Sequence, residues 1–140
     1  MKNVGFSLLH NLAIQRQGVE KLLEQIQPEL LQTDEGKLLL ASLQVPLLFH
    51  LRVEDKLLIP ILDVGALHWP RIAAVMAKWD LDLRTCEATV QAFFQHWFCL
   101  DSPEGDLASE WESLRNLVAR RMEIAEQFLY PAYQDISIKA

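Results

Sequence analysis

A histidine and a glutamate stand one helical turn apart in the middle of the chain, at His50 and Glu54. Side chains four residues apart on a helix point the same way, so the imidazole and the carboxylate can act on one atom. Both groups suit divalent iron, manganese or zinc. One such pair is too small a ligand set for tight binding. The sequence therefore predicts a bound metal only if another helix supplies a third ligand, and His10 is the candidate.

The segment around this pair is nearly repeated later in the chain. The repeat is seen when Pro60 is aligned with Pro131. Three apolar pairs and one acidic pair then coincide, namely Leu43 with Leu114, Leu47 with Val118, Leu57 with Phe128, and Asp55 with Glu126. Two helices that carry one pattern are what a pseudo-symmetric helical bundle requires. The two halves differ at the polar positions of the shared apolar seam: Arg121 is aligned with His50, and Ala125 is aligned with Glu54.

The spacing of His50, Glu54 and Pro60 resembles the motif of the hemerythrin-like, HHE cation-binding family. That resemblance implies a four-helix bundle around a non-haem di-iron or other di-metal site, used for oxygen binding, iron handling or sensing. It also makes His10 a match for the ligand on the first helix. The second motif of the family is lost here, and residues 77–80 of the third helix, Ala-Lys-Trp-Asp, contain no histidine. These departures argue against a two-metal site.

Three interpretations of the site remain open. In the first, the site binds no metal, and the Arg121 guanidinium forms a bidentate ion pair with Glu54, because a buried arginine needs an anion. In the second, one iron, manganese or zinc ion is held by His10, His50 and Glu54. In the third, there is no site, and His50 is an ordinary core histidine whose hydrogen bonds are satisfied.

Four helices are predicted to position these residues. The first spans 3–26 and ends before Pro28. The second runs from the cap at Thr33 to about Val64, with Gly65 as its stop. The third begins at Pro70 and continues to about residue 100, with a break near 80–82; the fourth follows the loop at 101–106, runs to about Tyr133 and leaves a frayed tail at 136–140. No segment alternates as a strand does. The chain is therefore predicted to be all-α, a single domain over 1–140 with an up-down-up-down antiparallel four-helix bundle of hemerythrin-like type.

The third helix carries an aromatic cluster at Phe93, Phe94, Trp97 and Phe98. A helix that is apolar on more than one side is usually buried on more than one side. The cluster therefore predicts either a contact with a homodimer or protein partner, or a region that the chain's own loops cover. The sequence does not decide between the two.

Composition and charge narrow the function classes. The net charge of −6 argues against nucleic-acid binding, which needs clustered Lys and Arg. Cys86 and Cys99 show neither CxxC nor zinc-ligand spacing, which favours a reducing cytoplasm. The N-terminus lacks a signal-peptide pattern. The longest apolar stretch, 38–51, is shorter than a membrane span, so no membrane contact is expected.

Catalytic signatures are missing from the sequence. There is no Gly-rich phosphate loop and no nucleophile elbow, and nothing suggests a substrate for a His50–Glu54 acid–base pair. We therefore expect a non-enzymatic binding or regulatory module with a degenerate metal site and no cofactor. One alternative is a metal or oxygen sensor that retains one iron or similar ion. Another is a regulator that binds a protein partner through the aromatic face, since residues 52–57 are also similar to a short stretch of bacterial anti-sigma regulators of the Rsd/AlgQ type.

Overall fold

The computed structural model describes the backbone of residues 2–99 and 103–139, and all secondary structure within those ranges is helical. Helix α1 spans Lys2–Gln25 and is followed by a short 3-10 turn, η1, at Pro28–Leu30. Helix α2 (Asp34–Val53) begins at Thr33, whose hydroxyl accepts a hydrogen bond from the Gly36 amide at 3.0 Å. This is the cap that the sequence predicts.

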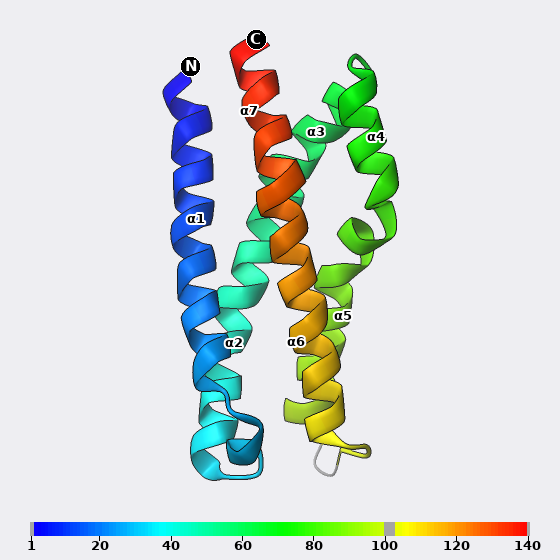
Figure 1. Cartoon of the computed structure of the whole chain (residues 1–140). Helices are drawn as coiled ribbons and strands as arrows, with labels where there is room; N and C mark the ends of the chain where they lie inside the picture. Colours follow the sequence, from blue (N-terminus) through cyan, green and yellow to red (C-terminus); the bar gives the residue numbers. More distant parts are fainter. Residues whose placement is uncertain (1, 100–102, 140) are drawn as a thin grey trace.

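The remaining helices follow in close succession (Figure 1). A π turn, η2, joins α2 directly to α3, and a second π turn, η3, joins α6 directly to α7. The bounds are η2 Glu54–Leu58, α3 Ile59–Ala66, α4 Pro70–Lys78, α5 Asp80–Phe98, α6 Leu107–Ile124, η3 Ala125–Leu129 and α7 Tyr130–Lys139. The predicted break in the third helix is present at Trp79. Asp106 caps α6 by accepting from the Ala108 amide at 3.1 Å.

The two π turns occupy equivalent places in the sequence repeat. The amide of Ile59 bonds back to the carbonyl of Glu54, and the amide of Tyr130 bonds back to that of Ala125, five residues earlier in each case. A proline follows each turn. Proline lacks an amide proton, and its ring collides with the carbonyl four residues before it, so a wider turn relieves the conflict. The repeat is therefore a repeat of structure as well as of sequence.

Each π turn adds one residue to its helix and so shifts the buried face by one position. Leu58 and Leu62 are fully buried after the first turn, whereas Leu57 and Ile61 are exposed. A regular helical period would place Leu57 on the buried seam, as its alignment with Phe128 predicts. That assignment was wrong because the extra residue of η2 was not expected.

The long helices pack side by side in the order of the chain. α1 contacts α2, α2 contacts α5, α5 contacts α6, and α7 contacts both α1 and α3. α3 also packs on α4 (Figure 1). Two apolar clusters result. One lies around α2, α5 and α6, and the other around α3, α4 and α7. The first reaches Leu51 and Met122 and the second begins at Leu58 and Ile124, so a polar layer at 50–55 lies between them.

Both predicted ends of the repeated helices lie too early. α3 continues through Gly65 to Ala66, and α7 continues past Tyr133 to Lys139. A Cβ atom at Gly65 would lie 2.6 Å from Ile136 Cδ1, which shows how closely the two helices approach. The expected frayed tail is helical up to Lys139 because Ile136 packs against α3 there. Ala140 lies outside the described residues.

One continuous helix among the described residues, Asp34–Ala66, is long and apolar enough to cross a membrane by length and composition. Buried helices of water-soluble proteins pass the same test, and 39% of the apolar window is buried here. This is weak evidence for a membrane location. The expectation of no membrane contact stays a prediction.

Candidate functional site

Three charged or polar side chains are buried together between the two apolar clusters. His50, Glu54 and Arg121 each expose only 1% of their surface. α2 supplies the histidine, η2 the glutamate and α6 the arginine. Charges at this depth are stable only when they are paired and hydrogen-bonded. The contacts around Arg121 show how this is achieved.

Arg121 bridges two carboxylates and a backbone carbonyl. Its Nη2 lies 2.8 Å from Asp55 Oδ1 and 3.3 Å from Glu54 Oε1. Its Nη1 donates to the carbonyl of Leu83 in α5 at 3.2 Å. The Nε of Arg121 is buried without a partner among the described residues. The structure therefore brings Glu54 and Arg121 together, but through one shared nitrogen and not through the expected bidentate pair.

Glu54 also receives a phenolic hydrogen bond. The Tyr130 hydroxyl, at the start of α7, donates to Glu54 Oε2 at 2.6 Å. Burial, together with the negative charge of Glu54, raises the pKa of Tyr130 far above its ordinary value, so the phenol remains a donor at every physiological pH. One oxygen of the glutamate therefore faces the guanidinium and the other faces the phenol.

His50 is held between α1 and Glu54. Its Nδ1 donates to Gln15 Oε1 at 3.0 Å, and its Nε2 lies 3.6 Å from Glu54 Oε2. Burial lowers the pKa of His50 below its ordinary value of 6.5; Glu54 opposes this shift, and Arg121 adds to it. The imidazole is therefore neutral near pH 7. A neutral histidine leaves Arg121 as the cation that balances the buried Glu54 carboxylate.

The rim of the cluster is formed by further ion pairs. Burial raises the pKa of Asp55, and its hydrogen bond with Glu87 adds to this effect, while Arg121 counteracts it. Arg52 contacts Glu87 at 2.8 Å. On another side, Arg16 of α1 contacts Glu126 of η3 at 2.9 Å. Asp55 and Glu126 are equivalent in the repeat, and each binds an arginine on a neighbouring helix.

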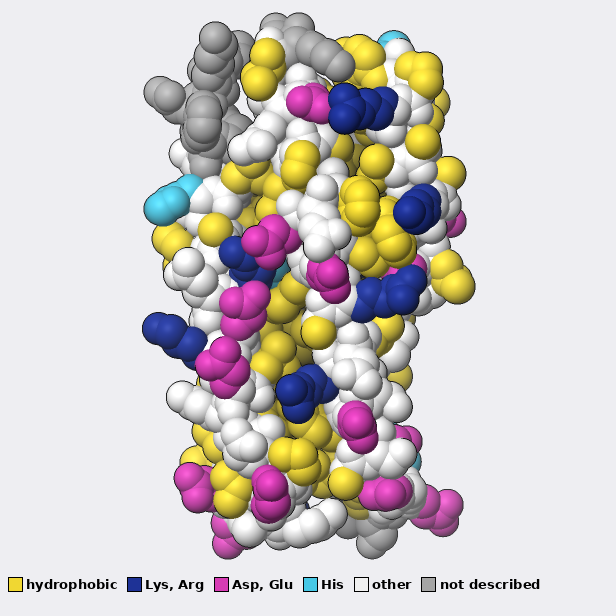
Figure 2. All heavy atoms as spheres, in the orientation of Figure 1, with side chains coloured by type: hydrophobic (Ala, Val, Ile, Leu, Met, Phe, Trp, Pro, Cys, Tyr) yellow, Lys and Arg dark blue, Asp and Glu magenta, His cyan; other side chains and the backbone are white. Residues whose placement is uncertain are grey.

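The α1, α6 and α7 side of the molecule shows how the core is enclosed. Hydrophobic side chains lie in the furrow between α1 and the α6–α7 helix, bordered by acidic and basic side chains (Figure 2).

Cys86 is fully buried in the cluster around α2, α5 and α6. Burial raises the pKa of its thiol to about 11, although Arg121 opposes the shift. The thiol is thus protonated and shielded, which does not suit a nucleophile.

The expected metal-ligand set is not assembled. The His10 side chain is exposed, and Gln15 is the residue of α1 that reaches His50. The reason is how α1 is placed along α2. Gln15, the residue that faces His50, lies five residues after His10, which is more than one helical turn. Within residues 2–99 and 103–139, no group of three His, Cys, Asp or Glu side chains has the geometry of a metal site.

The predicted aromatic docking face is divided between core and surface. Phe93 and Phe94 are buried and pack edge-to-face with each other, with ring centroids 5.3 Å apart. α5 packs on both α2 and α6 and turns these two rings inward, so the prediction of a partner contact now depends on Trp97 and Phe98 and stays a prediction. Trp97 is partly buried and Phe98 is partly exposed.

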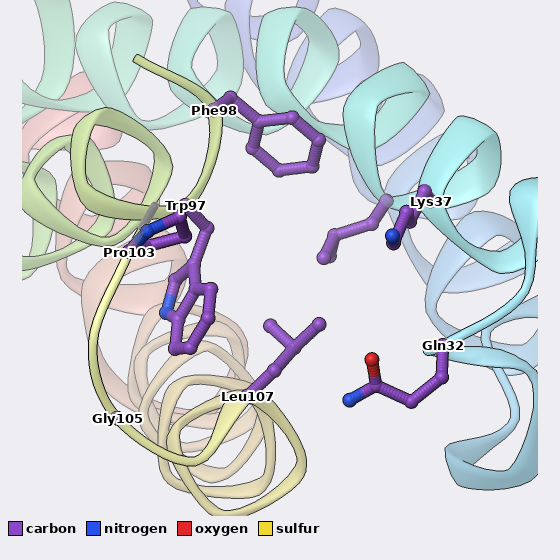
Figure 3. Close-up of a pocket in the computed structure, with 8 residues that line it drawn as sticks. Gln32, Lys37, Trp97, Phe98, Pro103, Gly105 and Leu107 are labelled. Atoms are coloured by element: carbon purple, nitrogen blue, oxygen red, sulfur yellow. The ribbon is translucent and has the colours of Figure 1, made fainter. Parts of the chain in front are cut away.

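Trp97 and Phe98 border a cavity at the end of the molecule where α2 begins and α5 ends. The cavity has a volume of about 480 Å³. Figure 3 shows Gln32 and Lys37 on one side, facing Trp97, Phe98 and Leu107. The cavity is remote in sequence and structure from the ion cluster, and none of the cluster residues lines it.

Several residues of the cluster were not expected from the sequence. Gln15, Tyr130 and Leu83 lie on other helices, and their contact with the site depends on how the helices pack. Asp55 contacts Arg121 from the next helix. The signal for it in the sequence was the acidic pair of the repeat, in which Asp55 is aligned with Glu126.

Comparisons of the chain with protein-family models, with curated protein sequences and with solved structures found no match. The hemerythrin-like resemblance therefore rests on residues of this chain alone.

Proposed function

We propose that the protein is a non-catalytic binding or regulatory module built on a hemerythrin-like four-helix bundle whose metal site has been replaced by an ion pair. The observation that supports this most directly is the place of Arg121. It stands where the sequence repeat would put a second ligand histidine, and its guanidinium lies between Glu54 and Asp55. A fixed positive charge there does the electrostatic work of a bound cation.

The packing order is consistent with such a bundle. α1, the α2–α3 helix, the α4–α5 segment and the α6–α7 helix would be its four members, joined in an up-down-up-down order. Contacts of α1 with α2, α2 with α5, α5 with α6 and α7 with α1 close the ring. In this arrangement the ion cluster lies in the middle of the bundle, where metal-binding bundles place their ligands.

Neutral His50 fits the same proposal. A protonated His50 would be a second cation and would be repelled by Arg121. Burial keeps the His50 imidazole uncharged. The single-metal alternative through His10, His50 and Glu54 has weaker support, because His10 is exposed and Gln15 takes the place of the third ligand. The bundle is then a rigid scaffold whose biological role lies in its surfaces.

Restoring the missing motif tests the proposal. The double variant Arg121→His, Ala125→Glu places the second His-xxx-Glu pair opposite His50 and Glu54. We expect it to bind Fe²⁺, Co²⁺ or Zn²⁺ stoichiometrically, as measured by metal analysis and by the d–d spectrum of Co²⁺. The wild type should bind none of them stoichiometrically after purification without chelator.

A matched control places the same ligands on the exposed side of α6. Glu112→His, Asn116→Glu has the same spacing at two exposed positions of α6 and should not bind metal tightly. Wild-type protein that carries stoichiometric iron, manganese or zinc, and loses it on His50→Ala, would contradict the proposal.

A further inference from the structure

The outer side of the α2–η2–α3 helix carries an unusual amount of exposed apolar surface. Six side chains of this helix are between 39% and 75% exposed. We call them the outer stripe: Leu38, Val45, Phe49, Leu57, Ile61 and Val64. They make up six of the eleven large hydrophobic side chains that are substantially exposed among the described residues. One continuous helix thus holds most of the apolar surface that the fold leaves uncovered.

The π turn keeps the outer stripe on one face. The spacing from Phe49 to Leu57 is eight residues, one more than two turns of α-helix. In a regular helix that extra residue would rotate the later members by about 80° away from the earlier ones. η2 lies between the two residues and absorbs the extra position. With this turn, helix geometry keeps the six side chains on one side of the helix over a length of roughly 40 Å.

Four members of the outer stripe are placed symmetrically about Leu51. Leu38 and Val64 are equally far from that residue along the chain, and so are Val45 and Leu57. The other two members, Ile61 and Phe49, are mirrored by Ala41 and by the partly buried Val53, which are apolar but lie outside the stripe. When two copies of such a helix lie antiparallel, each apolar side chain meets an apolar side chain. This is the condition for a twofold contact, in which residue i meets j and j meets i.

We propose that the outer stripe is the surface through which two copies of this chain associate, with their α2–η2–α3 helices antiparallel about a twofold axis near Leu51. A Val, Leu, Ile or Phe side chain offers about 60–120 Å² of apolar surface. Six of them, each roughly half exposed, contribute roughly 200–350 Å² per copy before the flanking atoms are counted. For two copies this apolar area alone is smaller than the total of about 1,200 Å² at the small end of specific interfaces, so the flanking atoms would have to supply the rest of the contact. We therefore expect a reversible dimer.

The charges beside the stripe are compatible with self-association. Arg52 flanks its centre, and twofold symmetry would bring the two copies of Arg52 close together. Each is already paired with the Glu87 of its own α5 at 2.8 Å. The Arg52 charge is therefore compensated within each copy. Each chain carries a net charge of −6, so we expect added salt to strengthen the association.

Sedimentation of the full chain over concentrations from about 1 µM to about 1 mM tests the dimer. The wild type should shift from monomer to dimer within this range. Val45→Glu should remain monomeric, since it places two buried charges in the contact. Leu81→Glu is the matched control, because Leu81 has the same 75% exposure as Val45 but lies on α5. Leu38→Glu repeats the test at the end of the stripe, and circular dichroism reports whether each variant is folded.

Cysteine cross-linking tests the antiparallel orientation. In a Cys99→Ser background, a mixture of Val45→Cys and Leu57→Cys copies should form a mixed disulfide under a mild oxidant much faster than either variant alone. Wild-type protein that stays monomeric at every concentration would overturn the proposal. Faster cross-linking of Val45→Cys with itself would also overturn it, as would a monomer that instead pellets with lipid vesicles through the same stripe.

Discussion

At the scale of single residues, the buried layer depends on one nitrogen that serves two acids. Nη2 of Arg121 contacts Glu54 and Asp55, and the Tyr130 hydroxyl completes the hydrogen bonding of Glu54. Desolvation of two ions offsets most of their attraction, so the pair contributes little net stability compared with an apolar core. Removing one partner is different, because it leaves the other charge buried and unpaired.

Substitution of Arg121 by methionine should lower the free energy of unfolding by about 3–5 kcal/mol. Methionine fills a similar volume but leaves Glu54 without its cation. Adding Glu54→Gln should restore part of the loss, because the amide is neutral and still accepts from Tyr130. Urea denaturation of the two single variants and the double variant measures the coupling.

The control for this cycle is Arg115→Met, an exposed position of the same helix. We expect it to change the free energy of unfolding by no more than about 0.5 kcal/mol. Equal losses for Arg115→Met and Arg121→Met would show that the buried cluster carries no special electrostatic role.

Acid should weaken the fold through His50. Burial lowers the pKa of this imidazole, so below about pH 6.5 the unfolded chain binds a proton that the folded chain resists until the pH reaches the folded pKa. The contribution of His50 to stability is fully present above about pH 6.5 and is lost as the pH falls through the folded pKa. Asp55 has the opposite sign at lower pH, because burial raises its pKa.

The His50 effect is isolated by the difference between wild type and His50→Gln. Urea midpoints measured from pH 7.5 to pH 5 should fall more steeply for the wild type than for this variant. His10→Gln, at an exposed histidine, should keep the wild-type slope. A parallel pH profile for wild type and His50→Gln would contradict a neutral buried imidazole.

At the scale of the helices, a close approach of backbone to backbone fixes the start of α2. A Cβ atom at Gly36 would lie 1.7 Å from the carbonyl oxygen of Leu30. Neither atom belongs to a flexible side chain, so the η1 segment or α2 itself would have to move. This is a position where only glycine fits.

We therefore expect Gly36→Ala to destabilise the fold by about 2 kcal/mol or more, as measured by thermal or urea unfolding. Gly18→Ala is the matched control. Gly18 lies in the middle of α1 with nothing within 4 Å of its would-be Cβ. There alanine should stabilise by about 0.5–1 kcal/mol, because it improves helix propensity. Similar effects at both positions would contradict the close approach at Leu30.

The helices also show where prediction from sequence reaches its limit. Starts with a capping side chain, such as those at Thr33 and Asp106, were predictable because the cap is local chemistry. The ends at Ala66 and Lys139 were not, because they depend on the contact of Ile136 with Gly65 across two helices. The π turns were missed for a related reason. Pro60 and Pro131 were used only to align the two halves of the repeat, and their effect on which face of the helix is buried was not considered.

At the scale of the whole molecule, the sequence repeat was the most informative signal. It led to the expectation that Arg121 lies near Glu54, because the alignment of the two halves needs only the chain itself. The all-helical chain was predicted separately, from helix caps and from the lack of strand alternation. It could not predict which residues of α1 reach the site. His10 and Gln15 lie on the same helix, and only the packing of α1 against α2 decides that Gln15 meets His50. α1 has no counterpart in the repeat, so the repeat gives no information on how far along α2 each turn of α1 lies.

The matched π turns also have a consequence for the history of the chain. An extra residue inside a helix rotates everything after it, so it is tolerated only where the later contacts have adjusted to the new phase. Both long helices carry this extra residue at the same place, directly before their prolines. If the two halves descend from one duplicated helical hairpin, the insertion and the proline were already present in that ancestor. The two halves thus share the course of the backbone here and differ in the side chains it carries, His50 and Glu54 in one and Arg121 and Ala125 in the other.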